Sequence, residues 1–317
     1  MPLIPKIYRK GLDAMLQDTG HIFTPIKEEL LCFHNTSTTE LIDPTLPYHR
    51  HDAYEVYLFL RGNSLMYLEQ ACYKLVPGDL IVISPGELHR CICLDTQTYE
   101  RIGLNIKRTA LEKLSSQRTS LSACFENHAF GQNNLTRLTQ EQVVFYTGLA
   151  EQLISCLGSD EYGQDVLAEA YATQLLVYIN TLYRSSTHSP DDIMPDLVSN
   201  TMSYIKSHLA EGITSGRLEQ EFHYSSKYIS RLFREHTGLT IRSYIIDQRV
   251  SLAKSHLAAG KSVAEACELS GFSDYANFIR SFKKTAGISP GKYRANVYSE
   301  RYRNEAAALA GRKKRWS

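Results

Sequence analysis

Short apolar runs dominate the first part of the chain, from about residue 21 to residue 125. Residues 55–60 and 80–83 are rich in β-branched and aromatic side chains, which favour strands. Turn-forming residues bound these runs, for example at positions 77–79 and 84–86. Several short strands at this spacing predict a β-sandwich or a β-barrel.

From about residue 139, apolar side chains recur every three or four positions, the period of an amphipathic helix. They are Val143, Val144, Leu149, Leu153, Ile154 and Leu157 in one stretch, and Val166, Leu167, Leu175, Leu176, Ile179 and Leu182 in the next. We therefore expect two helices within residues 131–184. Their apolar stripes can pack against the strand domain, pair with a second subunit, or do both.

Residues 185–195 are small, polar and interrupted by proline, which predicts a linker. Short helices are expected from there to about residue 300. The remaining residues, 301–317, end in the run Arg-Lys-Lys-Arg at 312–315 and predict a solvated basic tail.

The composition of the 317 residues is that of an ordinary globular protein, with 43% apolar residues and 35 Lys and Arg against 34 Asp and Glu. No apolar run reaches the ~18 residues of a membrane span, and residues 1–6 lack the apolar core of a signal peptide. Seven scattered cysteines without CxxC spacing argue against a disulfide framework or a structural zinc site. We therefore expect a cytoplasmic protein with no membrane partner.

Charge is distributed unevenly along the chain. Residues 1–190 hold 15 Lys and Arg and 21 Asp and Glu, a net charge of −6, whereas residues 191–317 hold 20 and 13, a net charge of +7. A basic domain on an acidic body is typical of a protein in which one domain meets a polyanion such as nucleic acid.

Two segments of the basic part repeat each other at an offset of 49 residues. The identical pairs are Arg231/Arg280, Phe233/Phe282, Gly238/Gly287 and Tyr244/Tyr293. Each copy predicts a helix, N-capped by Ser225 in the first copy and by Ser273 or Asp274 in the second. In both copies the glycine is expected to end the helix. A short helix at 263–267, broken by Gly271, precedes the second copy, so the pattern is that of a helix-turn-helix.

The end of the basic part closely resembles the signature of AraC/XylS-type transcription regulators. The matching residues are 271–284, Gly-Ile-Ser-Pro at 287–290 and Tyr-Arg at 293–294. The resemblance covers about residues 196–296. It implies two helix-turn-helix units joined by a central helix at about 241–259, with both recognition helices in successive major grooves of double-stranded DNA.

The first helix-turn-helix unit departs from the family pattern at two positions. Glu219 stands where a small residue is usual, and His223 stands where the turn usually has glycine. The second unit keeps Cys267 and Gly271 at these places. The first unit is therefore expected to be the more distorted, and which unit dominates affinity stays open.

Side-chain chemistry suggests the DNA contacts. Arg231 and Arg280 can bind guanine or phosphate, and Lys227, Arg234 and Lys283 suit phosphate. Ser230, Ser273, Tyr275 and Asn277 can form hydrogen bonds to base edges or backbone, while Ala276 and Ile279 can contact a thymine methyl group. For each cation a solvated helix face is the alternative, and for Ile279 an intramolecular contact.

A second motif lies in the acidic part. It resembles the two cupin motifs of a small β-barrel. The first motif is formed by His49, His51 and Glu55, and the second by Pro-Gly-Glu-Leu-His at 85–89. The resemblance implies that His49, His51, Glu55 and His89 could bind a transition metal such as Mn, Fe, Ni or Zn. The first three share parity, so a strand would place them on one face. Ser84 and Cys93 depart from the pattern, and hydrogen bonding within the barrel is the alternative role.

A barrel of this size can also hold one small molecule, and the family resemblance implies such an effector. The candidate effector-binding residues are Tyr48, Tyr54, Tyr57, Tyr67 and Arg90.

The sequence thus predicts an α+β chain with a cupin-like effector-binding β-barrel at 1–130, a helical pair, a linker, and an all-α domain with two helix-turn-helix units at 196–300. We expect a non-enzymatic, homodimeric, sequence-specific DNA-binding regulator controlled by a small-molecule effector. The alternatives are a cupin metalloenzyme with an accessory domain, and a constitutive regulator whose barrel is purely structural.

Overall fold

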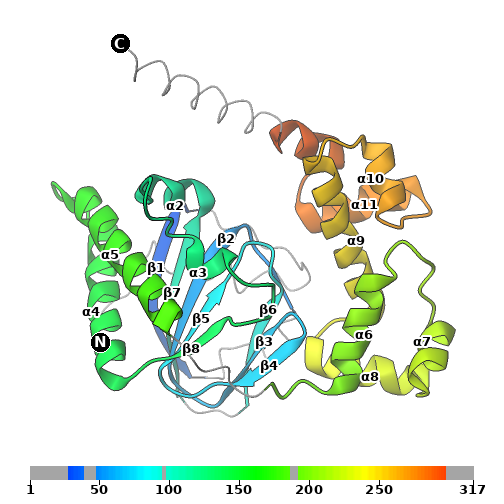
Figure 1. Ribbon diagram of the computed structural model, residues 1–317, viewed down its shortest axis with the longest axis horizontal. Coiled ribbons are helices and arrows are strands. Elements are labelled where there is room, and N and C mark those ends of the chain that lie inside the picture. Colours follow the sequence, from blue (N-terminus) through cyan, green and yellow to red (C-terminus); the bar gives the residue numbers. More distant parts are fainter. Residues whose placement is uncertain (1–27, 39–47, 95–97, 186–191, 298–317) are drawn as a thin grey trace. The chain divides into compact units, whose positions relative to one another are not determined.

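The computed structural model describes residues 28–38, 48–94, 98–185 and 192–297. The chain divides into two compact units, Met1–Pro195 and Asp196–Ser317 (Figure 1). The predicted basic tail at 301–317 lies outside the described residues. Within the described residues, no helix is long and apolar enough to cross a lipid bilayer.

The first unit contains two antiparallel sheets. The strands are β1 (Leu30–Thr38), β2 (Ala53–Arg61), β3 (Ser64–Leu68), β4 (Ala71–Lys74), β5 (Asp79–Ile83), β6 (His89–Cys93), β7 (Thr98–Lys107) and β8 (Leu135–Arg137). The large sheet has the order β1-β7-β2-β5-β8, and the small sheet has the order β4-β3-β6. An isolated backbone pair between His49 and His89 joins the approach to β2 with the small sheet.

The two sheets pack face to face over a buried apolar cluster. Tyr57 and Ile81 contribute to it from the large sheet, and Met66 and Tyr73 from the small sheet. Because side chains alternate along a strand, the same face of β7 carries Tyr99, Arg101, Gly103 and Asn105. We call the space between the two sheets, into which these side chains point, the interior.

The described part of this unit also contains the helices α2 (Arg108–Leu114), α3 (Ala123–Glu126), α4 (Gln140–Leu157) and α5 (Gln164–Ser185). Helices α4 and α5 pack on the outer face of the large sheet, away from the small sheet (Figure 1). Leu149 and Leu153 of α4 and Leu176 and Ile179 of α5 join the outward side chains of β2 and β7 in one core. The periodicity of the sequence therefore predicted both helices correctly.

The second unit is entirely helical in its described residues. Its helices are α6 (Asp196–Ser207), α7 (Ser215–Phe222), α8 (Ser226–Thr237), α9 (Ile241–Ala258), α10 (Val263–Leu269) and α11 (Tyr275–Ala286). The long helix α9 connects the pair α7–α8 to the pair α10–α11 (Figure 1). Val250, Ala253 and Leu257 of α9 form a core with Phe278 and Phe282 of α11.

The strands and helices agree with the predicted α+β class, a strand domain followed by a helical domain with two helix-turn-helix units. In place of the predicted cupin-like barrel, the strands of the described residues form two separate sheets.

Candidate nucleic-acid interface and interior polar cluster

The second helix pair, α10–α11, turns sharply at Gly271. This residue has φ +82°, and a Cβ atom placed on it would lie 2.1 Å from the carbonyl oxygen of Leu209. Only glycine fits, because both the left-handed backbone and the close approach exclude a side chain. Asp274, one of the two predicted caps, accepts a hydrogen bond from the backbone N–H of Asn277 and starts α11.

The first helix pair, α7–α8, forms its turn without glycine. His223 adopts a left-handed conformation with φ 58°, at a cost of roughly 1–2 kcal/mol for a residue with a side chain. Glu219 accepts a 2.6 Å hydrogen bond from the backbone N–H of Ser226, and this bond lowers the pKa of Glu219. Ser225 caps α8 as predicted. The turn therefore forms with a left-handed residue in both units, and Glu219 satisfies an amide at the start of α8.

Each of the helices α8 and α11 has one buried and one exposed face. Ile229 and Phe233 of α8, and Phe278 and Phe282 of α11, are at most 1% exposed. Most of the predicted DNA-contacting residues are exposed, namely Lys227, Ser230, Arg231, Arg234, Ser273, Tyr275, Ala276, Arg280 and Lys283. Asn277 and Ile279 are half-buried, and Ile279 packs against the core. The alternative of an intramolecular contact therefore applies to Ile279.

Arg249 of α9 joins the two helix pairs. Its Nε and a terminal nitrogen donate hydrogen bonds of 2.9 and 2.8 Å to the carbonyl oxygens of Leu209 and Glu211, which precede α7. Its guanidinium also lies 5.9 Å from the ring centroid of Phe272, beside the turn of the second pair. Partial burial lowers the pKa of Arg249. One side chain thus fixes both pairs to the central helix.

A cleft of about 1200 Å³ lies between the two helix pairs. Arg231 and Arg234 of α8 and Arg242 and Arg249 of α9 line it, with Asn277 from the second pair. Glu211, Glu235 and Glu268 also line the cleft, so its lining carries charges of both signs.

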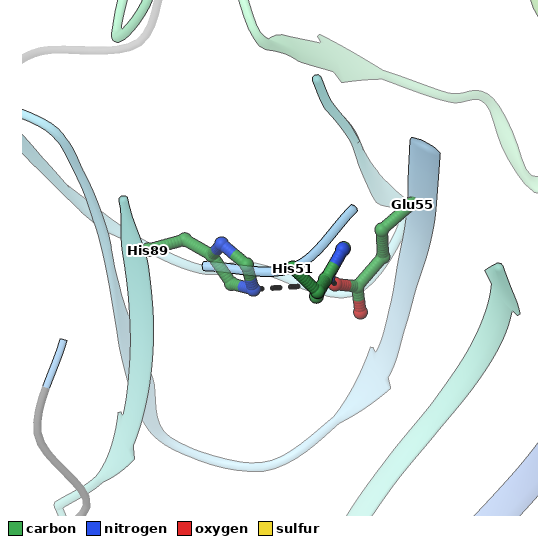
Figure 2. Close-up of side chains that lie close together, drawn as sticks. All are labelled: His51, Glu55 and His89. Atoms are coloured by element: carbon green, nitrogen blue, oxygen red, sulfur yellow. Dashed lines mark hydrogen bonds and ion pairs between the residues drawn. The ribbon is translucent and has the colours of Figure 1, made fainter. Parts of the chain in front are cut away.

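In the first unit, three of the four predicted metal-ligating residues meet. His51, Glu55 and His89 are buried, and their candidate ligand atoms all lie within 4.8 Å of one another (Figure 2). Glu55 Oε2 lies 2.8 Å from His51 Nε2 and 3.3 Å from His89 Nε2. We call these three residues the His-Glu cluster.

Hydrogen bonds to the backbone orient both imidazole rings of the His-Glu cluster. Nδ1 of His51 lies 2.9 Å from the carbonyl oxygen of Ala53, and Nδ1 of His89 lies 3.0 Å from that of Glu87. Because a carbonyl only accepts, each Nδ1 carries the proton, and each Nε2 is directed at Glu55.

The pKa values of the cluster follow from these contacts. Burial alone would raise the pKa of Glu55, but the hydrogen bonds and charges of the two histidines outweigh it and hold this pKa well below the usual range. Burial alone would lower the pKa of His89, yet the hydrogen bond to Glu55 raises it above its ordinary value.

His49 does not belong to the cluster, which corrects the prediction of four ligands. Regular strand alternation starts only at Ala53, so parity does not place His49 beside Glu55. Instead, the backbone of His49 pairs with that of His89, and the two rings pack with centroids 4.3 Å apart.

The five predicted effector-binding residues do not share one pocket, which is a second correction. Only Tyr57 faces the interior, where its hydroxyl lies 3.3 Å from Cys91 Sγ. Tyr54 faces the helices and packs on Phe125. Tyr48, Tyr67 and Arg90 lie together on the opposite face of the small sheet. Alternation along each strand separates these residues.

The sequence did not identify two polar residues of the interior as site residues, namely Arg101 and Asn105 of β7. Asn105 is opposite Glu55 in the strand register, and Arg101 is opposite Phe59. The only sign of their position in the sequence is that the apolar residues 102, 104 and 106 alternate with them and with Gly103. Such alternation normally indicates a solvent-facing side rather than an interior.

The geometry thus describes a sheet domain with buried polar groups in an otherwise apolar interior, followed by a pair of helix-turn-helix units with exposed cations. This combination is typical of a DNA-binding regulator with a separate sensor domain.

Comparison with known proteins agrees with this class. A model of an AraC-like ligand binding domain matches residues 38–176, and a model of a helix-turn-helix domain matches residues 218–296. The arabinose operon regulatory protein of Escherichia coli is 25% identical over 257 residues, covering 76% of this chain and 80% of that protein. The transcriptional activator RhaR of Pectobacterium atrosepticum is 24% identical over 262 residues, covering 79% of this chain and 87% of that protein. A crystal structure of ToxT from Vibrio cholerae has a TM-score of 0.34 at 14% identity, covering 84% of this chain and 97% of that one.

The chain belongs to the AraC family of transcription regulators, with an N-terminal ligand-binding domain and a C-terminal DNA-binding domain. The relatives are transcriptional regulators and activators, which are not enzymes, and nothing supports the metalloenzyme alternative.

The substitution Arg249→Lys tests the link between the helix pairs. A lysine cannot reach both carbonyl oxygens and cover Phe272 at once, so we expect a loss of about 1–3 kcal/mol of stability in the helical unit. We also expect weaker binding to a DNA site that spans two major grooves. Thermal unfolding and gel-shift titration of the full chain measure the two effects. Arg242→Lys, an exposed position of the same helix, is the control, and equal effects of both substitutions would contradict the role of Arg249.

Proposed function

We propose that α8 and α11 lie in two successive major grooves on one face of the DNA, with both helix-turn-helix units contributing contacts. The observation that carries this proposal is the exposed cationic face on each of two capped helices that α9 and Arg249 hold in one rigid unit. Arg231 and Arg280 occupy equivalent exposed positions and are the proposed base-reading residues. Lys227, Arg234 and Lys283 neutralise phosphates.

In this proposal the half-buried residues of α11 have reduced roles. The backbone N–H of Asn277 donates a hydrogen bond to the cap Asp274, and its side-chain oxygen accepts one from the Ser281 hydroxyl at 3.4 Å. Ile279 serves the core, so Ala276 is the better candidate for contact with a thymine methyl group.

Substitution of Arg280 tests base reading by the second unit. We expect Arg280→Ala to weaken binding by about 1–3 kcal/mol and to relax the preference at one base pair, because a forked contact to guanine is lost. Gel-shift titration against a selected site and its single-base variants measures both. Lys284→Ala, an exposed cation at the end of the same helix, is the control. Unchanged affinity and unchanged base preference for Arg280→Ala would reject the assignment.

We further propose that the protein acts as a homodimer through α4 and α5. Both helices bury one face against the large sheet, yet their outer surfaces keep large apolar side chains exposed. Val144 is 62% exposed and Val166 is 66% exposed, while Phe145 packs on Tyr178 of the neighbouring helix. Large apolar side chains exposed on two packed helices are the kind that subunit interfaces bury.

The substitution Val144→Glu tests this interface. A buried carboxylate at a subunit contact should raise the dimer dissociation constant about tenfold or more, which sedimentation over a concentration series measures. Leu94→Glu is the control, because Leu94 is also exposed and apolar but lies outside both helices. A monomeric unaltered protein, or equal effects of the two substitutions, would contradict dimerisation through α4.

We also propose that the His-Glu cluster binds a transition metal. Two histidines and one carboxylate suit Mn, Fe, Ni or Zn, and the backbone hydrogen bonds at both Nδ1 atoms leave Nε2 for a ligand bond. His51, Glu55 and His89 would hold the metal, and His49 would not. A bound cation would join β2 to β6 through Glu55 and His89.

Elemental analysis of the purified protein tests the metal. We expect one equivalent per chain, lost in His51→Ala and retained in His34→Ala, which alters a more exposed histidine paired with Glu100 and Glu151. Absence of stoichiometric metal from the unaltered protein would reject this proposal.

The proposed compartment is the cytoplasm. All seven cysteines lie in the described residues and all are free thiols, as expected where disulfides are kept reduced.

A further inference from the structure

The interior contains buried polar groups without partners. Asn105 is 0% exposed, and neither its amide nitrogen nor its amide oxygen has a hydrogen-bond partner among the described residues. The Nε of Arg101 is also buried without such a partner. Buried polar groups are normally hydrogen-bonded, and an unsatisfied one costs about 1–3 kcal/mol. Two such groups on one face of one strand therefore indicate a binding function.

The surroundings of Arg101 are aromatic rather than acidic. Its guanidinium carbon lies 5.3 Å from the ring centroid of Phe33, 5.2 Å from that of Tyr57 and 5.8 Å from that of Tyr99. The phenol groups of Tyr57 and Tyr99 bond to each other and to the Cys91 thiol. The rings stabilise the cation through their faces but leave its buried Nε–H group without an acceptor among the described residues.

Gly103 makes room for this arrangement. A Cβ atom on Gly103 would lie 2.2 Å from the Phe33 ring, so the ring occupies the place of a side chain between Arg101 and Asn105. Phe33 thereby covers one side of the guanidinium. The two polar side chains stay on the same face of β7, two strand positions to either side of Gly103.

The nearest carboxylate is already engaged. Glu55 is the strand neighbour of Asn105 and attracts Arg101 electrostatically, but its oxygen lies against the two histidines of the His-Glu cluster. No hydrogen bond joins Glu55 to Arg101 or to Asn105 among the described residues. A guanidinium presents a planar fork that fits a second carboxylate.

We propose that the effector of this regulator is a small hydroxylated carboxylate, such as a sugar acid or a hydroxy acid, bound in the interior. Its carboxylate accepts hydrogen bonds from Arg101, and a hydroxyl group pairs with Asn105, because a hydroxyl both donates and accepts. Arg101 disfavours a cationic ligand. The proposal rests on the function as a DNA-binding regulator with an N-terminal ligand-binding domain, and it names the chemistry of the ligand.

The first test needs no ligand. If Asn105 is unpaired in the free protein, Asn105→Leu should raise the melting temperature by about 3 °C or more, since an unsatisfied amide is replaced by an apolar group of similar size. Asn134→Leu is the matched control. Asn134 is also buried, but its amide nitrogen donates to the carbonyl oxygen of Val82 and to Glu87, so the loss of these two hydrogen bonds should lower the melting temperature. A lower melting temperature for Asn105→Leu would overturn the proposal.

The second test uses matched probes on the full chain. D-galacturonate, D-gluconate and D-lactate are compared in thermal shift and calorimetry with D-galactose, D-sorbitol and 1,2-propanediol, which lack the carboxylate. We expect at least one acid to stabilise the protein while its neutral partner does not. Arg101→Met and Asn105→Leu should each weaken that acid about tenfold to a hundredfold, the usual effect of losing a charge-assisted or paired hydrogen bond.

Three outcomes would overturn the site: no acid binds, the neutral partner binds equally well, or the acid binds Arg101→Met as tightly as the unaltered protein. Gel shifts with the same proteins separate this failure from failure of the proposed function. If the unaltered chain selects a DNA sequence and Arg101→Met binds it equally without acid, the regulator function stands and only the effector site is wrong. If the unaltered chain selects no DNA, the proposed function fails instead.

Discussion

The close approach of Gly271 to the carbonyl oxygen of Leu209 sets the geometry on which DNA binding by this protein depends. The turn of the second helix pair rests directly on backbone that precedes the first pair. Arg249 bonds to the same stretch and covers Phe272 beside the glycine. Two recognition helices can meet successive grooves only if their separation is fixed before binding, because ordering them afterwards would cost affinity. Here a missing side chain and one guanidinium provide that rigidity.

The first helix pair shows how the same turn can form from different residues. Glycine is replaced by His223 in a left-handed conformation, and the small residue is replaced by Glu219. The Glu219 carboxylate accepts the Ser226 N–H, adding a negative charge at the positive end of α8. The strain at one position is therefore offset by a charge-assisted hydrogen bond at a neighbouring one.

The sheet domain differs, since its otherwise apolar interior keeps buried polar groups where an apolar filling would be more stable. In the His-Glu cluster, Glu55 pairs with His51 at 2.8 Å and with His89 at 3.3 Å, whereas Arg101 Nε and the Asn105 amide have no partner among the described residues. Binding sites are commonly less stable than the cores around them, because groups that await a ligand cannot also be satisfied by the protein. The flanking helices α4 and α5 have the ordinary apolar core that compensates for this interior.

The sequence by itself determined the separation into a strand domain and a helical domain, the helix periods, the cap at Ser225, and the exposed cations of α8 and α11, and it narrowed the second cap to Ser273 or Asp274. These features are local, since a period of 3.6 residues, a capping oxygen and a glycine act over one or two turns. Only the tertiary structure decided that His49 leaves the His-Glu cluster, that the five predicted effector residues lie on different faces, and that Arg101 and Asn105 face the interior. Alternation along a strand states which residues share a side but not what covers that side, and in this protein a second sheet covers it.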